Sequence, residues 1–401
     1  MFERVFRAFR YRDFRLMWLG ACTSSIGTWM QLVAQAWLVY RLSDSAVYLG
    51  LDTFCGQIPI FLFSLFGGVY ADRKNRRNIL ILSQFVQMAC AFTLTLLVAT
   101  HVVQVWHILC LSAVVGTAQA FGGPAYQALI PSLVGEETLQ NAIALNSIQF
   151  NMARVLGPVF GGIALDSLGA AWCFGLNGFS FLAVIASLLS IQVRFVPAKT
   201  TDSVMASMKE GLKVIRMRPG MTGLIVLAFG LTLLSYPLST FLPVFAKDIF
   251  HGSSMTFTML LSTYGAGSVI GALLVAGARN QKGNGRNALL VMIMLGALIS
   301  MFAVSRNLVL SMVVLFATGI ALIIVFALNS SLVQIYVTDA LRGRVLSVYN
   351  VAFRGGMPIG SVLCGVLIKQ TSAPAIIAAN GVLVCAFALY FLVVERKVAK
   401  M

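Results

Sequence analysis

The sequence predicts an all-α polytopic membrane protein with twelve transmembrane helices, and two observations support that prediction. Hydrophobic residues make up 59% of the 401 residues and charged residues only 10%, whereas soluble domains carry about 25% charged residues. Apolar runs of roughly 20 residues recur from end to end, the length of a helix that crosses a bilayer core of about 30 Å. Transmembrane β-barrels alternate polar and apolar residues and lack such runs, so we expect helices, whose backbone groups bond internally.

The expected spans follow the apolar runs along the chain. Because no small-residue cleavage site follows the first run, we interpret that run as a retained span and not as a signal peptide. We place the spans at about 16–40, 46–71, 78–100, 104–130, 138–165, 171–193, 221–246, 255–278, 287–305, 308–335, 345–369 and 374–394.

The distribution of basic residues predicts the orientation. The chain has 29 Lys and Arg against 13 Asp and Glu, a net charge of +16. With both termini in the cytoplasm, 23 of the 29 cations fall in cytoplasmic segments and four in outer loops. This positive-inside pattern predicts a multi-pass protein of the bacterial inner (plasma) membrane, with both termini cytoplasmic and no nucleic-acid partner. The outer cations are Arg41, Lys247, Arg306 and Lys369.

The longest polar interruption, 194–220, divides the chain into six-helix bundles at 1–193 and 221–401. Within this linker, a helix over Met205–Met217 would separate an apolar face from a basic one. Such a helix would lie on the anionic inner leaflet, and the alternative is a solvated linker. The N-terminal stretch MFERVFRAFRYRDFR alternates Phe and Arg and is expected to rest on the same surface. The apolar face holds Met208, Leu212 and Ile215, and the basic face Lys209, Lys213 and Arg216.

The two halves contain an internal repeat. NSIQFNMARVLGP in the fifth span and SVYNVAFRGGMP in the eleventh share Ser, Arg and Pro, each displaced by 200 residues. One span later an Asn-Gly pair recurs with a displacement of 203. Parallel six-span repeats are typical of a transporter architecture with a binding site between its halves near mid-membrane, so we expect two pseudo-repeats around a central cavity. The pairs are Ser147/Ser347, Arg154/Arg354, Pro158/Pro358 and Asn177-Gly178/Asn380-Gly381.

The loop GGVYADRKNRR between the second and third spans resembles the G-x-x-x-D-R-x-G-R-R signature of the major facilitator superfamily. We expect Gly68 to permit close helix approach and Asp72 to end the helix. Asn75 stands where that family usually has glycine, but asparagine tolerates left-handed backbone. The resemblance implies a charge relay that locks the two halves in one state; the alternative is an ordinary positive-inside loop. The gating residues would be Gly68, Asp72, Arg73, Arg76 and Arg77.

A second motif, RVLGPVFGG in the fifth span, is similar to the G-P-x-x-G-G motif of antiporters in that superfamily. It contains Gly157, Pro158, Gly161 and Gly162. The alternative is tight helix packing without a role in coupling. Together with FRYRDFRLMWLG, LRGRVLSVYN and FRGGMPIG, the motif resembles the branch of macrolide-efflux and enterobactin-exporter proteins, which implies drug:proton antiport.

Polar residues inside the spans are the cavity candidates. In the first span Ser24 and the residues at i+4, i+7 and i+11 share one face; the alternative is that they bond a neighbouring helix. The arginines of the fifth and eleventh spans would be buried and line the cavity, or serve as structural clamps. The candidates are Thr28, Gln31, Gln35, Asn151, Arg154, Tyr236, Asn350 and Arg354.

Asp52 is the one acid clearly inside an apolar span. Removal from water raises the pKa of a carboxyl group, so Asp52 is our candidate for the proton-coupling residue. Alternatively it pairs with a buried arginine or is wetted at the outer mouth.

The remaining motifs exclude other classes of protein. The seven cysteines form no C-x-x-C pair, and we expect no metal and no cofactor. No G-x-S-x-G, H-E-x-x-H or phosphate-binding glycine loop occurs, so an enzyme is not expected. We expect a monomeric, proton-coupled exporter of a small amphipathic molecule, drug-like or siderophore-like. The alternatives are an uptake symporter or facilitator of the same fold and a non-transporting membrane sensor.

Overall fold

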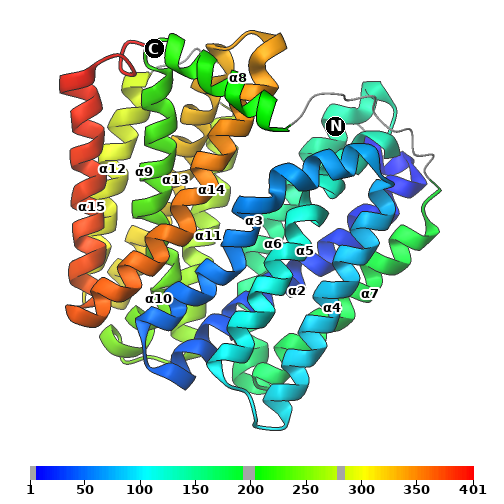
Figure 1. The fold of residues 1–401 in the computed structure, drawn as a ribbon. Coiled ribbons are helices and arrows are strands. Elements are labelled where there is room, and N and C mark those ends of the chain that lie inside the picture. Colours follow the sequence, from blue (N-terminus) through cyan, green and yellow to red (C-terminus); the bar gives the residue numbers. More distant parts are fainter. Residues whose placement is uncertain (1–5, 193–203, 278–284) are drawn as a thin grey trace. The chain divides into compact units, whose positions relative to one another are not determined.

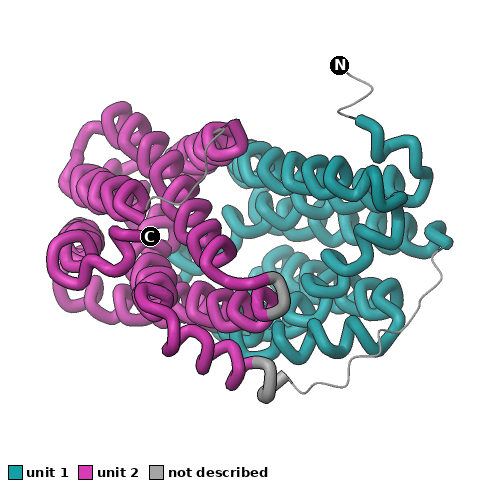
Figure 2. Tube along the Cα trace, turned by 90° about the horizontal axis from the view of Figure 1, so that it is seen from above, with its two compact units in different colours: residues 1–42, 55–201 teal, residues 43–54, 202–401 magenta. Residues whose placement is uncertain are grey.

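The computed structural model describes residues 6–192, 204–277 and 285–401, and these residues form helices joined by short turns (Figure 1). The chain divides into two compact units (Figure 2). Unit 1 comprises Met1–Leu42 and Cys55–Thr201, and unit 2 comprises Ser43–Phe54 and Asp202–Met401. The first residues of the second expected span therefore cluster with the later half of the chain.

Unit 1 contains the elements from η1 to α7, except the start of α3. They are η1 (Arg7–Arg10), α2 (Arg12–Ser43), α3 (Ala46–Arg73), α4 (Arg76–Ala99), α5 (Val105–Leu129), η2 (Ile130–Leu133), η3 (Glu136–Thr138), α6 (Leu139–Ser167) and α7 (Ala170–Ser190).

Unit 2 contains the remaining elements and the start of α3. They are α8 (Val204–Met217), α9 (Met221–Thr240), α10 (Leu242–Val244), η4 (Phe245–Ile249), α11 (Ser254–Gly277), α12 (Gly285–Val304), α13 (Leu308–Ile335), α14 (Asp339–Gln370), α15 (Ala373–Tyr390) and η5 (Phe391–Glu395).

Within the described ranges, eleven helical segments are long and apolar enough to cross a membrane. They coincide with the second to twelfth expected spans. The first expected span lies in α2, which has 32 residues but is not among the eleven. Its length suffices at 1.5 Å per residue, but its serine, threonine and glutamine residues lower its hydropathy. Membrane crossing by α2, and with it the total of twelve spans, stays a prediction.

N-cap side chains define the start of several of these helices. Asn75 accepts a hydrogen bond from Arg77 N at the start of α4, and Asn307 and Ser372 cap α13 and α15 in the same way. Such caps satisfy amide groups that the first turn leaves unbonded. Gly220, before α9, has φ of +81°, a left-handed conformation that glycine adopts without steric cost.

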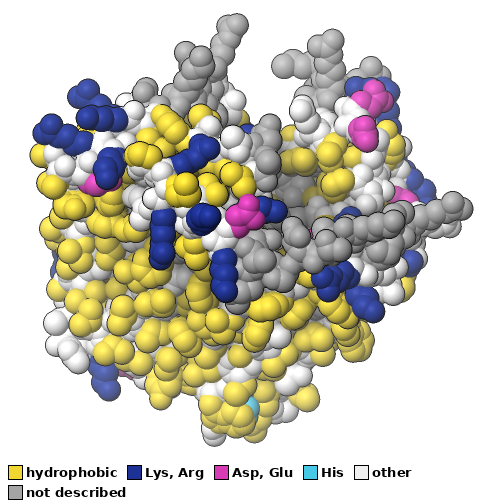
Figure 3. Space-filling view, turned by 45° about the horizontal axis from the view of Figure 1, so that its top comes forward, with side chains coloured by type: hydrophobic (Ala, Val, Ile, Leu, Met, Phe, Trp, Pro, Cys, Tyr) yellow, Lys and Arg dark blue, Asp and Glu magenta, His cyan; other side chains and the backbone are white. Residues whose placement is uncertain are grey.

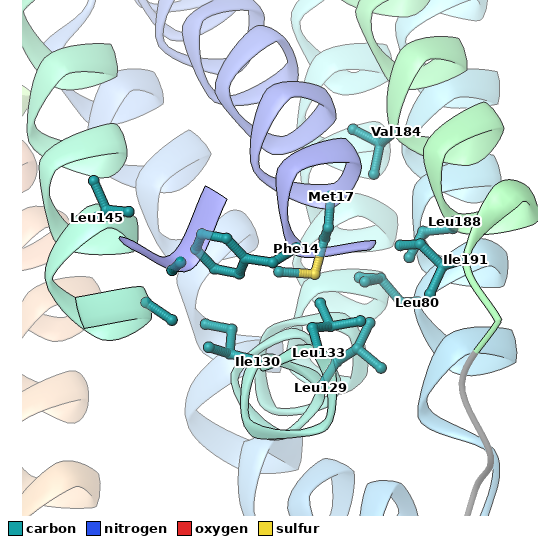
Figure 4. Packing of buried hydrophobic residues seen from close by; sticks show 12 residues of the cluster. Phe14, Met17, Leu80, Leu129, Ile130, Leu133, Leu145, Val184, Leu188 and Ile191 are labelled. Atoms are coloured by element: carbon teal, nitrogen blue, oxygen red, sulfur yellow. The ribbon is translucent and has the colours of Figure 1, made fainter. Parts of the chain in front are cut away.

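An apolar cluster closes one end of unit 1, where α2, α4, α5, η2, α6 and α7 converge (Figure 4). Phe14 and Met17 from α2 are almost fully buried there, beside Leu188 of α7. The N-terminal segment joins this packing, because Ala8 is buried and its amide donates to Asn141 Oδ1 at 2.8 Å. The described part of this segment therefore packs on the helix ends of its own unit, in addition to any contact with a leaflet.

Glycines bring equivalent helices together in the two halves of the chain. A Cβ at Gly157 would lie 2.3 Å from Trp29 Cβ, so α6 and α2 pack backbone to backbone. A Cβ at Gly356 would lie 2.5 Å from Phe229 O, so α14 and α9 meet in the same manner. Gly67 likewise faces α5, and Gly267 faces α13. The sequence repeat is thus accompanied by a repeat in close helix contacts.

The start of α3 packs on α14 inside unit 2. A Cβ at Gly50 would lie 2.5 Å from Ser361 O, and one at Gly365 would lie 2.9 Å from Ala46 O. These two glycines therefore allow the helices to cross in direct backbone contact. Beside the crossing, Lys247 Nζ lies 2.6 Å from Asp44 Oδ1. This contact joins the turn after α2 to the turn after α10, 203 residues apart in the sequence.

Candidate gating loop and transport site

The gating loop is built from the end of α3, the residues Lys74 and Asn75, and the start of α4. Asp72 lies in the last turn of α3, one residue before the helix ends. The Arg76 guanidinium forms an ion pair with the Asp72 carboxylate, with Nη2 3.4 Å from Oδ1. The same guanidinium donates hydrogen bonds to Ala71 O at 3.3 Å and to Ala128 O at 2.9 Å. Arg76 thus connects the start of α4 to the ends of α3 and α5.

Arg77 makes a second clamp from the same loop. Its Nε donates to Leu188 O at 2.5 Å, and its Nη2 donates to Leu189 O at 2.8 Å. These carbonyls belong to the last turn of α7, where helix carbonyls lack intrahelical partners and carry partial negative charge. Arg73, by contrast, is exposed. The described contacts of Asp72, Arg76 and Arg77 all lie within unit 1.

Two details of the loop differ from expectation. A Cβ at Gly68 would meet nothing within 4 Å, so the prediction that Gly68 permits close helix approach is wrong. Gly67 does this instead, since its Cβ would lie 2.2 Å from Ala120 O. Asn75 has φ of −62°, so it does not adopt the left-handed backbone expected for this position. It ends the turn by capping α4, which needs an extended conformation.

The fifth-span motif RVLGPVFGG lies in α6 and faces α2. Gly157 and Gly161 pack against the backbone of residues 26–30, and Gly162 and Pro158 are buried. Pro158 is inside the helix, where its ring removes one backbone hydrogen bond. The motif therefore forms a seam of close packing between α6 and α2, as the tight-packing alternative in the sequence analysis describes. A role of the motif in coupling stays a prediction.

The two arginines expected to be buried differ from each other. Arg154 is half-buried, with its guanidinium carbon 5.9 Å from the centre of the Trp29 ring, within the range of a cation–π contact. Arg354 and Asn350 are exposed, although surrounding groups desolvate the Arg354 guanidinium in part. They lie on the face of α14 opposite Gly356 and Gly360, which pack against α9.

The polar stripe of the first span is mostly bonded to neighbouring helices. Gln31 Oε1 accepts a hydrogen bond from Asn177 Nδ2 at 2.6 Å, and Gln35 Nε2 donates to Ser112 Oγ at 2.9 Å. Ser24 is buried, whereas Thr28 is exposed. The two glutamines therefore join α2 to α7 and α5, which favours the helix-bonding alternative for them.

The positions of the remaining candidates, Asn151, Tyr236 and Asp52, do not decide between a cavity role and a packing role. Asn151 Nδ2 donates to Ser147 O within its own helix at 2.8 Å. Tyr236 is half-buried. Asp52 is also half-buried, and it lies in the segment of α3 that belongs to unit 2, two residues after the crossing glycine Gly50 and about half a helical turn away. A small cavity in unit 2 is lined by residues of α9, α12 and α13 and by Val398, and includes none of these candidates.

Two buried amides were missed as bonding residues. Asn177, 2% exposed, also accepts a hydrogen bond from Ser180 Oγ at 3.0 Å. Gln149, also 2% exposed, donates to Ala21 O at 3.1 Å. The sequence contained a signal for both residues, because each is an amide inside an apolar span. Such a side chain is costly in lipid unless it forms a hydrogen bond with another helix. Within the described residues, no group of three or more His, Cys, Asp or Glu side chains forms a metal site.

Comparison with known families settles the class of protein. The family model described as "Transmembrane secretion effector" matches residues 4–400. The chain belongs to this family, a branch of the major facilitator superfamily. The predicted superfamily and branch are confirmed. This chain is therefore a transporter-family membrane protein and not an enzyme, and it crosses the membrane several times.

Three relatives match this family member along nearly its whole length. The staphyloferrin A transporter of Staphylococcus aureus is 25% identical, covering 93% of this chain and 94% of the relative. The enterobactin exporter of Escherichia coli O1:K1 is 25% identical over 92% and 88% of the two chains. Macrolide efflux protein A of Streptococcus pyogenes is 23% identical over 95% and 96%.

Among solved structures, the nucleoside transporter NupG shares the fold of this family member. The TM-score is 0.74, with 14% sequence identity over 95% of this chain and 98% of the other. At this identity the likeness concerns the fold alone.

Proposed function

We propose that this protein exports a small amphipathic molecule, drug-like or siderophore-like, across the bacterial inner membrane in exchange for protons, by alternating access. The observation that carries the proposal is full-length membership of a family whose relatives are named as transporters or exporters of staphyloferrin A, enterobactin and macrolides. No phosphate-binding loop for ATP occurs in the sequence, so an ion gradient is the proposed energy source.

The proposed architecture is twelve spans in two six-helix repeats, divided at the linker 194–220, around a central cavity. The paired glycine contacts support it, because Gly157 and Gly356 place equivalent helices in equivalent contact. We assign Arg154, Arg354 and the polar residues beside them to the cavity wall. The exposed face of α14 that carries Asn350 and Arg354 is consistent with this assignment.

An export assay tests the function directly. A deletion strain should become more susceptible to one or more compounds in a panel of macrolides, other drugs and siderophore loads, and plasmid-borne protein should restore resistance. Everted membrane vesicles should accumulate the same compound when energised. Uptake of that compound into intact cells, with no accumulation in everted vesicles, would favour the symporter or facilitator alternative. No transport of any compound in reconstituted liposomes would favour a sensor.

The proton-coupling proposal assigns the titrating group to Asp52. Arginine cannot serve, since it stays protonated across the accessible pH range. Asp52→Asn should abolish transport driven by an imposed pH gradient in proteoliposomes, but leave substrate counterflow between equal pools intact. A mutant that responds fully to the pH gradient would exclude Asp52 as the carrier.

The orientation proposal places both termini and the linker in the cytoplasm. A cysteine introduced at Ser253, before α11, should react with an impermeant maleimide in intact cells. A cysteine at Lys209 in α8 should react only after the membrane is opened. Labelling of both from outside would mean that the span count is wrong, and labelling at Lys209 alone would mean that the topology is inverted.

A further inference from the structure

The helix α8 is held at the end of unit 2 by its connection to a membrane span. It ends at Met217, and the apolar span α9 begins four residues later at Met221, after the left-handed turn at Gly220. The side chain of Arg218, in the same turn, donates to the backbone carbonyl of Tyr336 at the end of α13. The C-terminal end of α8 therefore lies beside the start of the apolar span α9 and the end of α13.

One face of α8 packs on α14. Ile215 is 3% exposed. A Cβ at Gly211 would lie 2.5 Å from Arg344 O, so the two helices touch at the backbone. Glu210 and Arg344 form an ion pair beside this contact. Figure 1 shows α8 running across the end of unit 2, transverse to α9.

This packing leaves a defined free face, which we call the α8 basic face. Its centre holds the exposed side chains of Lys209, Lys213 and Arg216. Its edges hold Leu212 and Met217, 40% and 72% exposed. At 3.6 residues per turn these five side chains form one continuous strip. Lys and Arg side chains gather over the corresponding end of the molecule, above an apolar surface (Figure 3).

The distribution of side chains around α8 differs from the one predicted from the sequence. Leu212 was grouped with Met208 and Ile215 on one apolar face, but the structure separates it, because Ile215 and Gly211 turn toward α14. Within the described residues, Leu212 and Met217 thus leave 40% and 72% of their surfaces exposed, on either side of three cations. A helix surrounded only by water would expose these apolar groups at a cost in free energy.

We propose that the α8 basic face binds the headgroups of anionic lipids in the cytoplasmic leaflet, with Leu212 and Met217 entering the boundary between headgroups and acyl chains. Charge complementarity and the depth set by α9 select this partner over a soluble anion or a protein. Each cation near an anionic bilayer contributes about a fivefold preference, so the three together contribute up to about a hundredfold. The proposal depends on the orientation proposed above, but not on the substrate or on proton coupling.

Hydrogen–deuterium exchange of the full-length protein in nanodiscs tests the proposal. Nanodiscs of phosphatidylcholine alone are compared with nanodiscs in which half of the lipid is phosphatidylglycerol. The amides of α8 should exchange at least about tenfold more slowly with phosphatidylglycerol present. In the triple variant Lys209→Gln/Lys213→Gln/Arg216→Gln, the two lipid compositions should give equal exchange.

A matched control removes the same charge elsewhere. Arg41, Arg306 and Lys369 are exposed cations on the predicted outer face, and their replacement by glutamine should leave the lipid dependence of α8 unchanged. Wild-type α8 that exchanges equally in both lipids would overturn the proposal, as would a triple variant that keeps the full effect. Equal protection from glycerol phosphate added to phosphatidylcholine nanodiscs would show a soluble-anion site and also overturn it.

Discussion

Lys247 Nζ lies 2.6 Å from Asp44 Oδ1 and joins the turn after α2 to the π-helical turn that follows α10, 203 residues away in the sequence. Asp44 has φ of +47°, a left-handed conformation that aspartate tolerates better than most residues. Both side chains are substantially exposed, at 38% and 74%. An exposed ion pair contributes at most about 1 kcal/mol, so we expect the crossing of α3 and α14 at Gly50 and Gly365 to hold this segment more strongly than the ion pair does.

A double-mutant cycle measures this ion pair. We expect Asp44→Asn and Lys247→Gln to show a coupling free energy of about 0.2–1 kcal/mol at low salt. The coupling should fall in about 1 M salt, where the Debye length is about 3 Å. The measurement is chemical unfolding of the two single variants and the double variant in detergent. Absence of coupling at every salt concentration would mean that the pair does not form in solution.

The adjacent glycines of the gating motif give a matched pair of substitutions. Gly67→Ala places a methyl group 2.2 Å from Ala120 O and should lower the thermal unfolding midpoint strongly, because two helix backbones must separate. Gly68→Ala enters open space and should be neutral or stabilise the helix by up to about 1 kcal/mol. Thermal unfolding of both variants decides between them. A larger loss in Gly68→Ala would refute the assigned helix rotation.

The packing seam of the fifth-span motif has a counterpart that tests its role. A Cβ at Gly161 would lie 3.0 Å from Met30, and one at Gly360 would lie 2.0 Å from Leu233 O. If packing alone matters, Gly360→Ala should be more destabilising than Gly161→Ala, and transport should fall in proportion to folded protein. Transport lost in Gly161→Ala at normal thermal stability would instead indicate a direct role of the motif in coupling.

Asp72→Asn tests the charge relay. We expect normal insertion with transport reduced at least about tenfold, because the loop loses an anion beside Arg73, Lys74, Arg76 and Arg77. Arg76 keeps its bonds to Ala71 O and Ala128 O, so the fold should persist. The measurement is initial transport rate per folded protein. A normal rate would reduce the motif to an ordinary basic loop.

Arg77→Lys tests the clamp on α7. Lysine cannot reproduce the planar fork that reaches Leu188 O and Leu189 O together, so we expect a loss of about 1–3 kcal/mol of stability. Arg73→Lys is the control, since Arg73 is exposed and the substitution keeps its charge. Chemical unfolding in detergent compares the two. Equal unfolding free energies of the two variants would show that the hydrogen bonds of Arg77 to α7 make no net contribution to stability.

Hydropathy and charge determined much about this protein from the sequence alone. A span needs about 20 apolar residues wherever it lies in the chain, so the positions of α3 to α7 and α9 to α15 could be predicted without knowledge of their neighbours. The loop and fifth-span motifs likewise identified the superfamily, because their residue types and spacing are local properties. Hydropathy predicts the span in α2 less clearly than the others. The polar residues that form its bonding face also lower the mean hydropathy of the helix.

Tertiary structure decided which side of each helix meets a partner. Successive residues on a helix are about 100° apart, so one position of rotation moves the packing role from Gly68 to Gly67. Packing against α14 likewise buries Ile215 but leaves Leu212 40% exposed. Only the fold could show that Gln31 and Gln35 bond to Asn177 and Ser112, since both partners are remote in sequence. It also placed Ser43–Phe54 with unit 2, because contact with α14 depends on two glycines more than 300 residues apart, Gly50 and Gly365, and no local pattern encodes that crossing.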